Sequence, residues 1–239
     1  MLIPDKTPKF TETSLNDISK PRLDRYAMAA RAARELKPGS VVNLGFGIPT
    51  LVSMFVPEEA EVIFHSENGL VGCGSVRTGE PDSVDPYCIN AGGQPVHLVR
   101  GASYLSHHES FELIRGGWID VSILGALQVG TNGDLANHHV PSKPAGSIGG
   151  AQDLAFCSKR VVVLMRHQDR VGRPKLVEHV SLPLTGPRCV DLVITDIAVV
   201  QLRGHRAILR EVLGGWTPDE VQAVTGIPLD LNDATELTI

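Results

Sequence analysis

The sequence lacks the features that usually mark a membrane protein, a nucleic-acid-binding protein or a secreted protein. No window approaches the ~18 uninterrupted apolar residues of a transmembrane helix. No run rich in Lys and Arg occurs, and the formal net charge of −5 argues against a nucleic-acid partner. The N-terminal region is polar and has no apolar stretch typical of a signal peptide. We therefore expect neither a membrane span nor a nucleic-acid ligand.

Cysteine is also scarce, and no pattern of ligand-type residues indicates a metal site. The four cysteines are far apart and form no C-x-x-C pair, so reduced thiols in a cytoplasmic protein are the simplest account. Cys73 lies six residues after Glu67 and could line a site there, but no His–Cys arrangement supports a catalytic thiol. The pairs His107-His108 and His138-His139 are adjacent residues, which seldom chelate one ion. We expect no metal, and we expect His108 to lie at a solvated helix start.

Apolar patterning predicts an α/β protein with a loose arm over residues 1–20 and a single domain over residues 21–239. Helices are expected at 21–37, 50–55, 106–114 and 218–224, strands at 41–44, 62–66, 96–99, 121–124, 160–165 and 190–200, and loops at 72–94 and 141–151, with a hairpin tip at Asn132-Gly133. Apolar strands that alternate with helices are typical of an open, mainly parallel sheet with helices on both faces.

The most informative residue is Glu67, which follows the apolar run Val62–Phe64. An acidic side chain at the end of a buried strand is costly to desolvate, so it usually has a partner or a task. Asn68-Gly69 favours a tight turn directly after it, because both residue types tolerate positive φ. The carboxyl ends of strands in open α/β sheets border the crevice in which ligands bind. An N-cap or a surface salt bridge is the alternative role for this carboxylate.

Glycine-rich loops at residues 45–49, 69–74 and 146–150 are the second notable feature. Glycine lets the backbone approach a ligand closely and exposes its N–H groups. The first loop is neither a Walker A motif nor a complete G-x-G-x-x-G fingerprint, so it is weak evidence for a nucleotide. Each loop taken alone is better explained as a tight turn.

Eight short segments, taken in order, carry a resemblance to a known enzyme family. They are Asn43–Thr50, Ser66–Gly69, Ile89–Gly92, Gly101–Tyr104, Ile114–Gly117, Gly133–Asn137, Gly149–Asp153 and Leu182–Gly186. Together they closely resemble the B-type subunit of family I CoA-transferases, with the 3-oxoacid and acetoacetate types nearest. The similarity runs from about residue 21 to 228. The resemblance implies an open α/β fold of the CoA-transferase type, in agreement with the apolar patterning.

The resemblance also implies a mechanism and a set of site residues. Glu67 would attack an acyl-CoA thioester, and the enzyme would pass through a mixed anhydride and a glutamyl-CoA thioester with ping-pong kinetics. Coenzyme A would be a substrate, and no cofactor is expected. The residues expected to bind substrate or stabilise oxyanions are Asn43, Gly45, Gly47, Asn68, Gly149, Gly150 and Ala151. By its match to the family's first loop, Asn43 is expected beside Glu67. The alternative is a polar group that caps the end of the sheet, and we favour the place beside Glu67 because a mid-strand Asn needs a buried partner.

A second polypeptide is implied as well. In this family the companion is an A-type subunit that supplies most of the CoA site, so the resemblance implies a heteromeric enzyme, as an α2β2 heterotetramer or a larger form. The substrates would be an acyl-CoA and a carboxylic acid.

The sequence departs from the family pattern in ways that make the expected pocket wall more polar. His138-His139 and Ser142 stand in the segment where the family usually has Trp-Met and Gly, and Gln152 replaces a usual Met. Trp118 stands where His is usual, and Gly93 where many members carry Lys. We expect a longer or more polar acyl group than acetoacetate. A CoA-thioester hydrolase or a carbon–carbon-bond-cleaving relative that uses the same glutamate is the first alternative, and a non-catalytic binding scaffold is the second.

Overall fold

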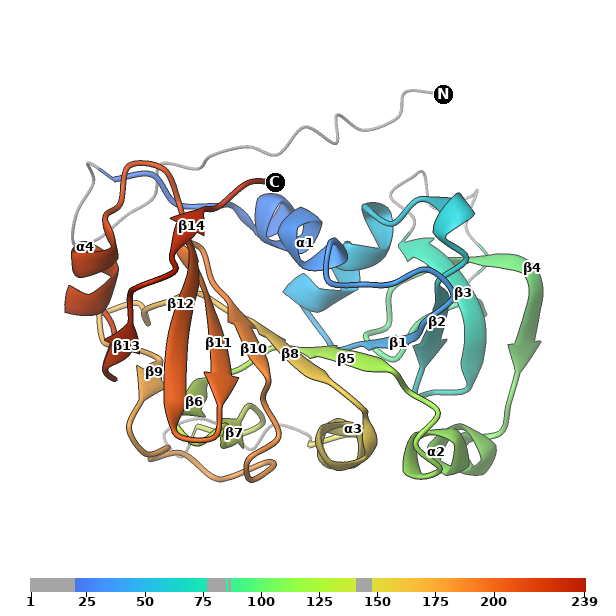
Figure 1. Ribbon diagram of the computed structural model, residues 1–239. Coiled ribbons are helices and arrows are strands. Elements are labelled where there is room, and N and C mark those ends of the chain that lie inside the picture. The colour runs from blue at the N-terminus through green and yellow to red at the C-terminus, as the bar shows by residue number, and fades with distance from the viewer. Residues whose placement is uncertain (1–19, 77–84, 86, 141–147) are drawn as a thin grey trace.

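The computed structural model describes residues 20–76, 85, 87–140 and 148–239 (Figure 1). The predicted arm therefore lies outside the described residues except for Lys20, and so does most of the loop predicted at 141–151. The α-helices are α1 (Arg25–Ala33), α2 (His107–Arg115), α3 (Ala151–Cys157) and α4 (Pro218–Ala223), and the 3-10 helices are η1 (Ile48–Met54) and η2 (Glu58–Ala60). In this part of the chain no helix combines the length and the apolar character needed to cross a bilayer.

An 11-stranded sheet forms the centre of the fold. In sheet order its strands are β13 (Leu229–Asp230), β12 (Arg206–Val212), β11 (Ala198–Arg203), β10 (Leu192–Ile194), β8 (Val161–Leu164), β5 (Val121–Leu124), β1 (Val41–Leu44), β2 (Ile63–Ser66), β3 (Leu70–Val76) and β4 (Val96–Tyr104), and β14 (Thr235–Glu236) pairs with β12. A smaller sheet contains β7 (Leu135–Ala136), β6 (Gln128–Gly130) and β9 (Leu176–Val177).

The middle of the large sheet is parallel, which confirms the predicted fold class. Neighbouring strands from β10 through β8, β5 and β1 to β2 all run in the same direction. Antiparallel strands flank this centre on both sides: β3 and β4 beyond β2, and β11 and β12 beyond β10. The strand order changes direction at β1, because the chain first adds β2 on one side of β1 and later adds β5 on the other.

Helices cover both faces of this sheet (Figure 1). On one face, α1 and η1 pack on apolar side chains such as Val42 and Phe64. On the other, α2 and α3 contribute Ile114 and Leu154 to a second core that includes Val163. Strands buried on both sides need apolar residues at nearly every position, since each fully buried aliphatic side chain stabilises the fold by about 1.5–3 kcal/mol.

Several boundaries differ from the sequence prediction. The loop predicted at 72–94 is wrong for residues 72–76, which continue β3 despite two glycines. The strand predicted at 96–99 extends to Tyr104. The strand predicted at 190–200 is two antiparallel strands, because Thr195 accepts the N–H of Ala198 at 3.0 Å and reverses the chain within an apolar stretch.

The helices expected at 106–114 and 218–224 agree with the structure to within one residue at each end, whereas the first two expected helices differ in extent or type. The helix expected at 21–37 covers only Arg25–Ala33 and begins after the N-cap Asp24. The helix expected at 50–55 is the 3-10 helix η1. Ser106 and Thr217 cap α2 and α4 through capping boxes. The predicted hairpin tip lies between β6 and β7, which pair antiparallel.

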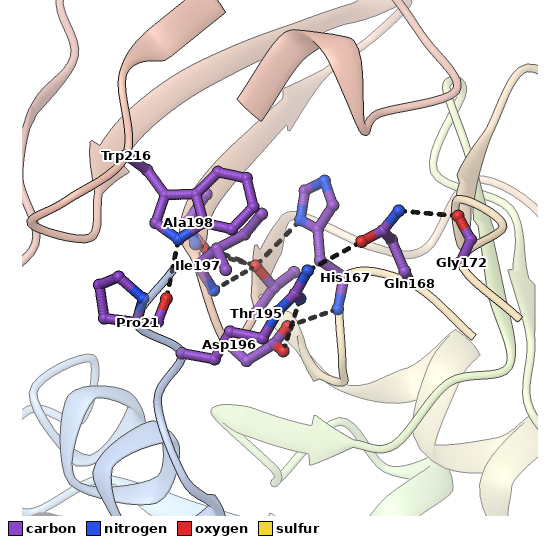
Figure 2. Close-up of polar contacts among 10 residues, drawn as sticks. Pro21, His167, Gln168, Gly172, Thr195, Asp196, Ile197, Ala198 and Trp216 are labelled. Atoms are coloured by element: carbon purple, nitrogen blue, oxygen red, sulfur yellow. Dashed lines mark hydrogen bonds and ion pairs between the residues drawn. The ribbon is translucent and has the colours of Figure 1, made fainter. Parts of the chain in front are cut away.

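A buried polar cluster connects the first described residues to the C-terminal strands (Figure 2). Asp196 accepts the backbone N–H of His167 at 2.7 Å and pairs with Arg22 at 3.0 Å. The indole N–H of Trp216 donates to the Pro21 carbonyl at 2.8 Å. Burial lowers the pKa of His167 to about 4, so its ring is neutral at physiological pH.

Candidate active site

Glu67 lies at the carboxyl end of β2, beside the position at which the strand order changes direction. In open α/β sheets this is where a crevice forms between loops that leave in opposite directions. The loop after β1 and the loop after β5 leave the sheet at the same edge, because β1, β2 and β5 are parallel. The topology therefore places Glu67 at the position where a ligand is expected.

A tight turn fixes the backbone at Glu67. The N–H of Gly69 donates to the Ser66 carbonyl at 2.9 Å, and β3 begins directly afterwards. Gly69 has φ +114°, and a Cβ there would overlap the Leu105 carbonyl oxygen, so only glycine fits. Asn68 makes the turn without a positive φ, and its side chain donates to the Ile89 carbonyl at 2.8 Å.

Two glycines close around the carboxylate of Glu67. The backbone N–H of Gly150 donates to Glu67 Oε1 at 3.1 Å, across 83 positions of sequence. A Cβ on Gly150 would overlap Oε2 and lie 3.0 Å from Cδ, and a Cβ on Gly149 would lie 3.0 Å from Oε1. Gly150 is the N-cap of α3, and Ala151 is the first helical residue. The sequence segments that contain Glu67 and Gly149–Ala151 are therefore brought together by the fold.

Asn43 lies on β1 directly opposite His65 of β2. Its amide nitrogen contacts His65 Nδ1 at 2.9 Å and the His65 carbonyl at 3.2 Å. The buried partner expected for Asn43 is thus His65, the second residue before Glu67. Its expected place beside Glu67 in a substrate site stays a prediction.

Gly45 and Gly47 shape the loop that follows β1. Gly45 donates its N–H to the Ile123 carbonyl at 2.8 Å, and a Cβ there would approach the backbone of β5 at 3.2 Å. Gly47 has φ +92° and accepts the hydroxyl of Thr50 at 2.7 Å, at the start of η1. Both glycines hold the neighbouring backbone at the same sheet edge as Glu67, and their contact with substrate stays a prediction.

Sequence reasoning missed two buried polar residues next to Glu67. His65 is 2% exposed, and Ser110 on α2 is fully buried. His65 Nε2 contacts Ser110 Oγ at 2.9 Å, and Ser110 Oγ donates to the backbone carbonyl of Glu67 at 2.9 Å. A histidine within an apolar strand is the one signal in the sequence that points to this group.

The other candidate groups are not arranged for chemistry. Cys73 is buried with its thiol 3.4 Å from the Phe64 carbonyl, and burial raises its pKa to about 11. His108 is solvent-exposed on the first turn of α2, as predicted. The described residues contain no group of three or more His, Cys, Asp or Glu side chains that could hold a metal ion.

The family model described as Coenzyme A transferase matches residues 26–223. The beta chain of a probable coenzyme A transferase from Bacillus subtilis is 50% identical over 203 residues, which cover 84% of this chain and 92% of that protein. The B-type chain of the 3-oxoadipate CoA-transferase from Pseudomonas putida is 41% identical, with 87% and 97% covered. The B-type chain of the succinyl-CoA:3-ketoacid coenzyme A transferase from Helicobacter pylori is 44% identical, with 84% and 96% covered.

Solved structures with the same fold are more distant in sequence. The acyl-CoA transferase YdiF of Escherichia coli O157:H7 superposes with a TM-score of 0.68 at 20% identity over 93% of this chain, which spans 44% of the YdiF chain. The glutaconate coenzyme A-transferase of Acidaminococcus fermentans gives a TM-score of 0.66 at 19% identity, with 90% of this chain and 88% of that chain covered.

Proposed function

The chain belongs to the coenzyme A transferase family, and from this premise we propose that it is the subunit whose Glu67 carries out the covalent chemistry of CoA transfer. The enzyme would move coenzyme A from an acyl-CoA to a carboxylic acid. The proposal depends on the hydrogen bond from the Gly150 N–H to Glu67 Oε1, which lies beside the position at which the strand order of the sheet changes direction.

The reaction divides into two exchanges at the same carboxylate. An oxygen of Glu67 attacks the thioester carbonyl, the carbon–sulfur bond breaks, and CoA leaves as a thiolate, so that an acyl-glutamyl anhydride remains on the enzyme. The thiolate then attacks the glutamyl carbonyl carbon, which releases the first acid and forms a glutamyl-CoA thioester. A second acid reverses these steps and leaves as the new acyl-CoA. A carboxylate suits this role because the anhydride and the thioester both retain the activation of the starting ester.

The two glycines suit the needs of these steps. Each step passes through a tetrahedral intermediate whose oxyanion requires a hydrogen-bond donor, and losing one such donor typically costs about 10²–10³-fold in rate. The N–H of Gly150 is already directed at the carboxylate that would become the glutamyl carbonyl. The absence of side chains at Gly149 and Gly150 leaves room for the Glu67 carboxylate to lie against their backbone.

We further propose an A-type partner subunit, most simply in an α2β2 heterotetramer. The three relatives above are all named as beta or B-type chains of their enzymes. Phe46 is 78% exposed in the loop after β1, at the edge that bears Glu67, where a partner could cover it. Co-expression with an A-type polypeptide should give a stable complex with full activity. Full activity of this chain alone would exclude the proposal.

The acyl group is proposed to be longer or more polar than acetoacetate. His138, which stands where the family usually has Trp, contacts the hydroxyl of Thr185 at 2.9 Å and so brings polar groups to the segment after β7. A relative acting on 3-oxoadipate is in keeping with this polarity. Initial rates across a panel of acyl-CoAs test the idea, and a clear preference for acetoacetyl-CoA with succinate would remove it.

We place the reaction in the cytoplasm, in keeping with four unpaired cysteines.

The decisive experiment is the mass of the Glu67 peptide after the assembled enzyme is incubated with acyl-CoA and rapidly quenched. An adduct on Glu67 is expected, and it should be absent from the Glu67→Gln variant, which keeps the size of the side chain but removes the nucleophilic charge. Product analysis with and without an acceptor acid separates transfer from hydrolysis. Undiminished turnover by Glu67→Gln would refute the proposed mechanism.

A further inference from the structure

A continuous line of buried hydrogen bonds runs from β1 through β2 and α2 to the backbone of Glu67. Asn43 contacts His65 Nδ1 at 2.9 Å, His65 Nε2 contacts Ser110 Oγ at 2.9 Å, and Ser110 Oγ donates to the Glu67 carbonyl at 2.9 Å. The three side-chain residues are 2%, 2% and 0% exposed, respectively. Sequence separations of 22, 45 and 43 residues mean that the line exists only in the folded protein.

The chemistry of the groups assigns a single direction to these bonds. The amide nitrogen of Asn43 faces the His65 carbonyl, which can only accept, so this nitrogen is a donor. His65 Nδ1 must then accept, which puts the ring proton on Nε2 and makes Nε2 the donor to Ser110. The Ser110 hydroxyl proton is left for the Glu67 carbonyl. The Asn43 amide nitrogen donates one proton to His65 Nδ1 and the other to the His65 carbonyl, and the two later donors have one acceptor each. No alternative pattern satisfies all of these groups.

The ring of His65 is neutral in this arrangement, because burial lowers its pKa to about 4. A neutral imidazole offers one donor and one acceptor, which is what the line requires at this position. The same tautomer is therefore maintained throughout the neutral pH range.

We propose that His65 and Ser110 are positioning residues that fix the backbone carbonyl of Glu67, while the N–H of Gly150 fixes the carboxylate of the same residue. The Ser110 bond fixes the backbone carbonyl of Glu67 relative to α2, and the Gly150 bond fixes Oε1 relative to α3. Because both its backbone carbonyl and its carboxylate are hydrogen-bonded, Glu67 has little freedom to move out of the orientation in which it would attack a thioester. This inference rests on the proposed role of Glu67 as the nucleophile.

Loss of the Ser110 hydrogen bond to Glu67 should have a measurable effect on the rate. Displacing a catalytic group by about 1 Å can reduce the rate by about 100-fold. Ser110→Ala removes the bond to Glu67 and leaves His65 Nε2 without its acceptor, while β2 and α2 keep their apolar contacts. We expect kcat to fall about 10- to 100-fold in this variant, with KM changed by no more than about threefold, because the substrate contacts are untouched.

The experiment uses the enzyme assembled with its A-type partner and measures single-turnover formation of the Glu67 adduct beside steady-state kcat and KM. His65→Leu should be about as slow as Ser110→Ala, and His65→Gln, which retains a donor near the position of Nε2, should recover most of the rate. The double variant should be no more than about threefold slower than the slower single variant, because both changes break the same line.

His167→Leu is the matched control. His167 is also buried, and one of its ring nitrogens contacts Thr195 Oγ1 at 3.0 Å (Figure 2). The other ring nitrogen contacts Thr225 Oγ1 at 2.8 Å. Thr195 lies in the turn between β10 and β11, and Thr225 follows α4; in the sheet order β10 and β11 are separated from β2 by β8, β5 and β1. The substitution should lower thermal stability as His65→Leu does, yet leave the single-turnover rate of the folded enzyme within about threefold of wild type.

The outcomes are distinguishable. A slow Ser110→Ala with unchanged KM, a recovering His65→Gln and a fast His167→Leu support the positioning role. If Glu67→Gln abolishes adduct formation but Ser110→Ala and His65→Leu react at the wild-type rate, the hydrogen-bonded line has only a structural role. The positioning role is then overturned, and the proposed function of Glu67 stands. If Glu67→Gln keeps its activity, the proposed function itself is overturned.

Discussion

The substitution Gly150→Ala offers the most direct test of how the carboxylate of Glu67 is held. The new methyl group would overlap Glu67 Oε2 and lie 3.0 Å from Cδ and 3.1 Å from Phe111 Cζ. Non-bonded heavy atoms pack comfortably at about 3.5–4.0 Å, so the carboxylate must move by roughly 1 Å. Gly150 has φ −82°, which alanine adopts without strain, so the effect of the clash is not mixed with a backbone penalty.

A displacement of this size should reduce kcat about 100-fold, and loss of the Gly150 hydrogen bond to Oε1 adds to that effect. Folding stability should change little, because a glycine-to-alanine change at a compatible φ stabilises by about 0.4–1 kcal/mol and partly offsets the clash. The assays are steady-state kinetics of the assembled enzyme and thermal unfolding, in which 1 kcal/mol corresponds to about 2–4 °C for a chain of this size.

Gly214→Ala is the matched control. A Cβ at Gly214 also meets a glutamate oxygen, Glu236 Oε1, at 3.2 Å, but Glu236 is an exposed side chain that can move aside. This variant should keep wild-type kinetics. If Gly150→Ala retained a rate within about threefold of wild type, the close fit of the glycine against Glu67 would have no catalytic meaning and the reasoning would fail.

Three further predictions concern the scaffold, both around the site and at His167. Gly69→Ala should destabilise by on the order of 3 kcal/mol in urea unfolding, since φ +114° and the Leu105 carbonyl both oppose a Cβ; an unchanged midpoint would contradict this. The pKa values of buried His65 and His167 fall from 6.5 to about 4, so only the unfolded state takes up protons as the pH drops below 6.5. Unfolding free energy should therefore decrease from pH 6.5 to 4 by up to about 3 kcal/mol per histidine, and a flat profile would refute both shifts. Burial raises the pKa of Cys73 to about 11, so iodoacetamide at pH 7.5 should leave its peptide unmodified in the folded protein, as mass spectrometry can check.

Elements whose local pattern agrees with their environment are predictable from the sequence. The central strands over residues 41–44 and 121–124 are apolar because helices cover both of their faces, so an apolar run indicates them directly. The segment from Gly72 to Val76 is predicted as loop because glycine disfavours strands in general, yet pairing with both β2 and β4 overrides that preference. The reversal at Thr195 leaves no sign in the sequence pattern, because the chain turns inside a single apolar stretch.

The sequence alone determined the fold class and the turn at Ser66–Gly69, because these depend on residues close together in the chain, and it singled out Glu67 through the ordered set of segments that resemble the family. Only the tertiary structure decided that Gly150, 83 positions away, donates to the carboxylate and that Ser110 supports the peptide behind it. A hydrogen bond requires its two atoms within about 3 Å, and periodicity along the chain carries no information on which distant segments come that close. That proximity follows from the packing of α2 and α3 against one face of the sheet, and it is this packing that turns an acidic residue at a strand end into a held and directed carboxylate.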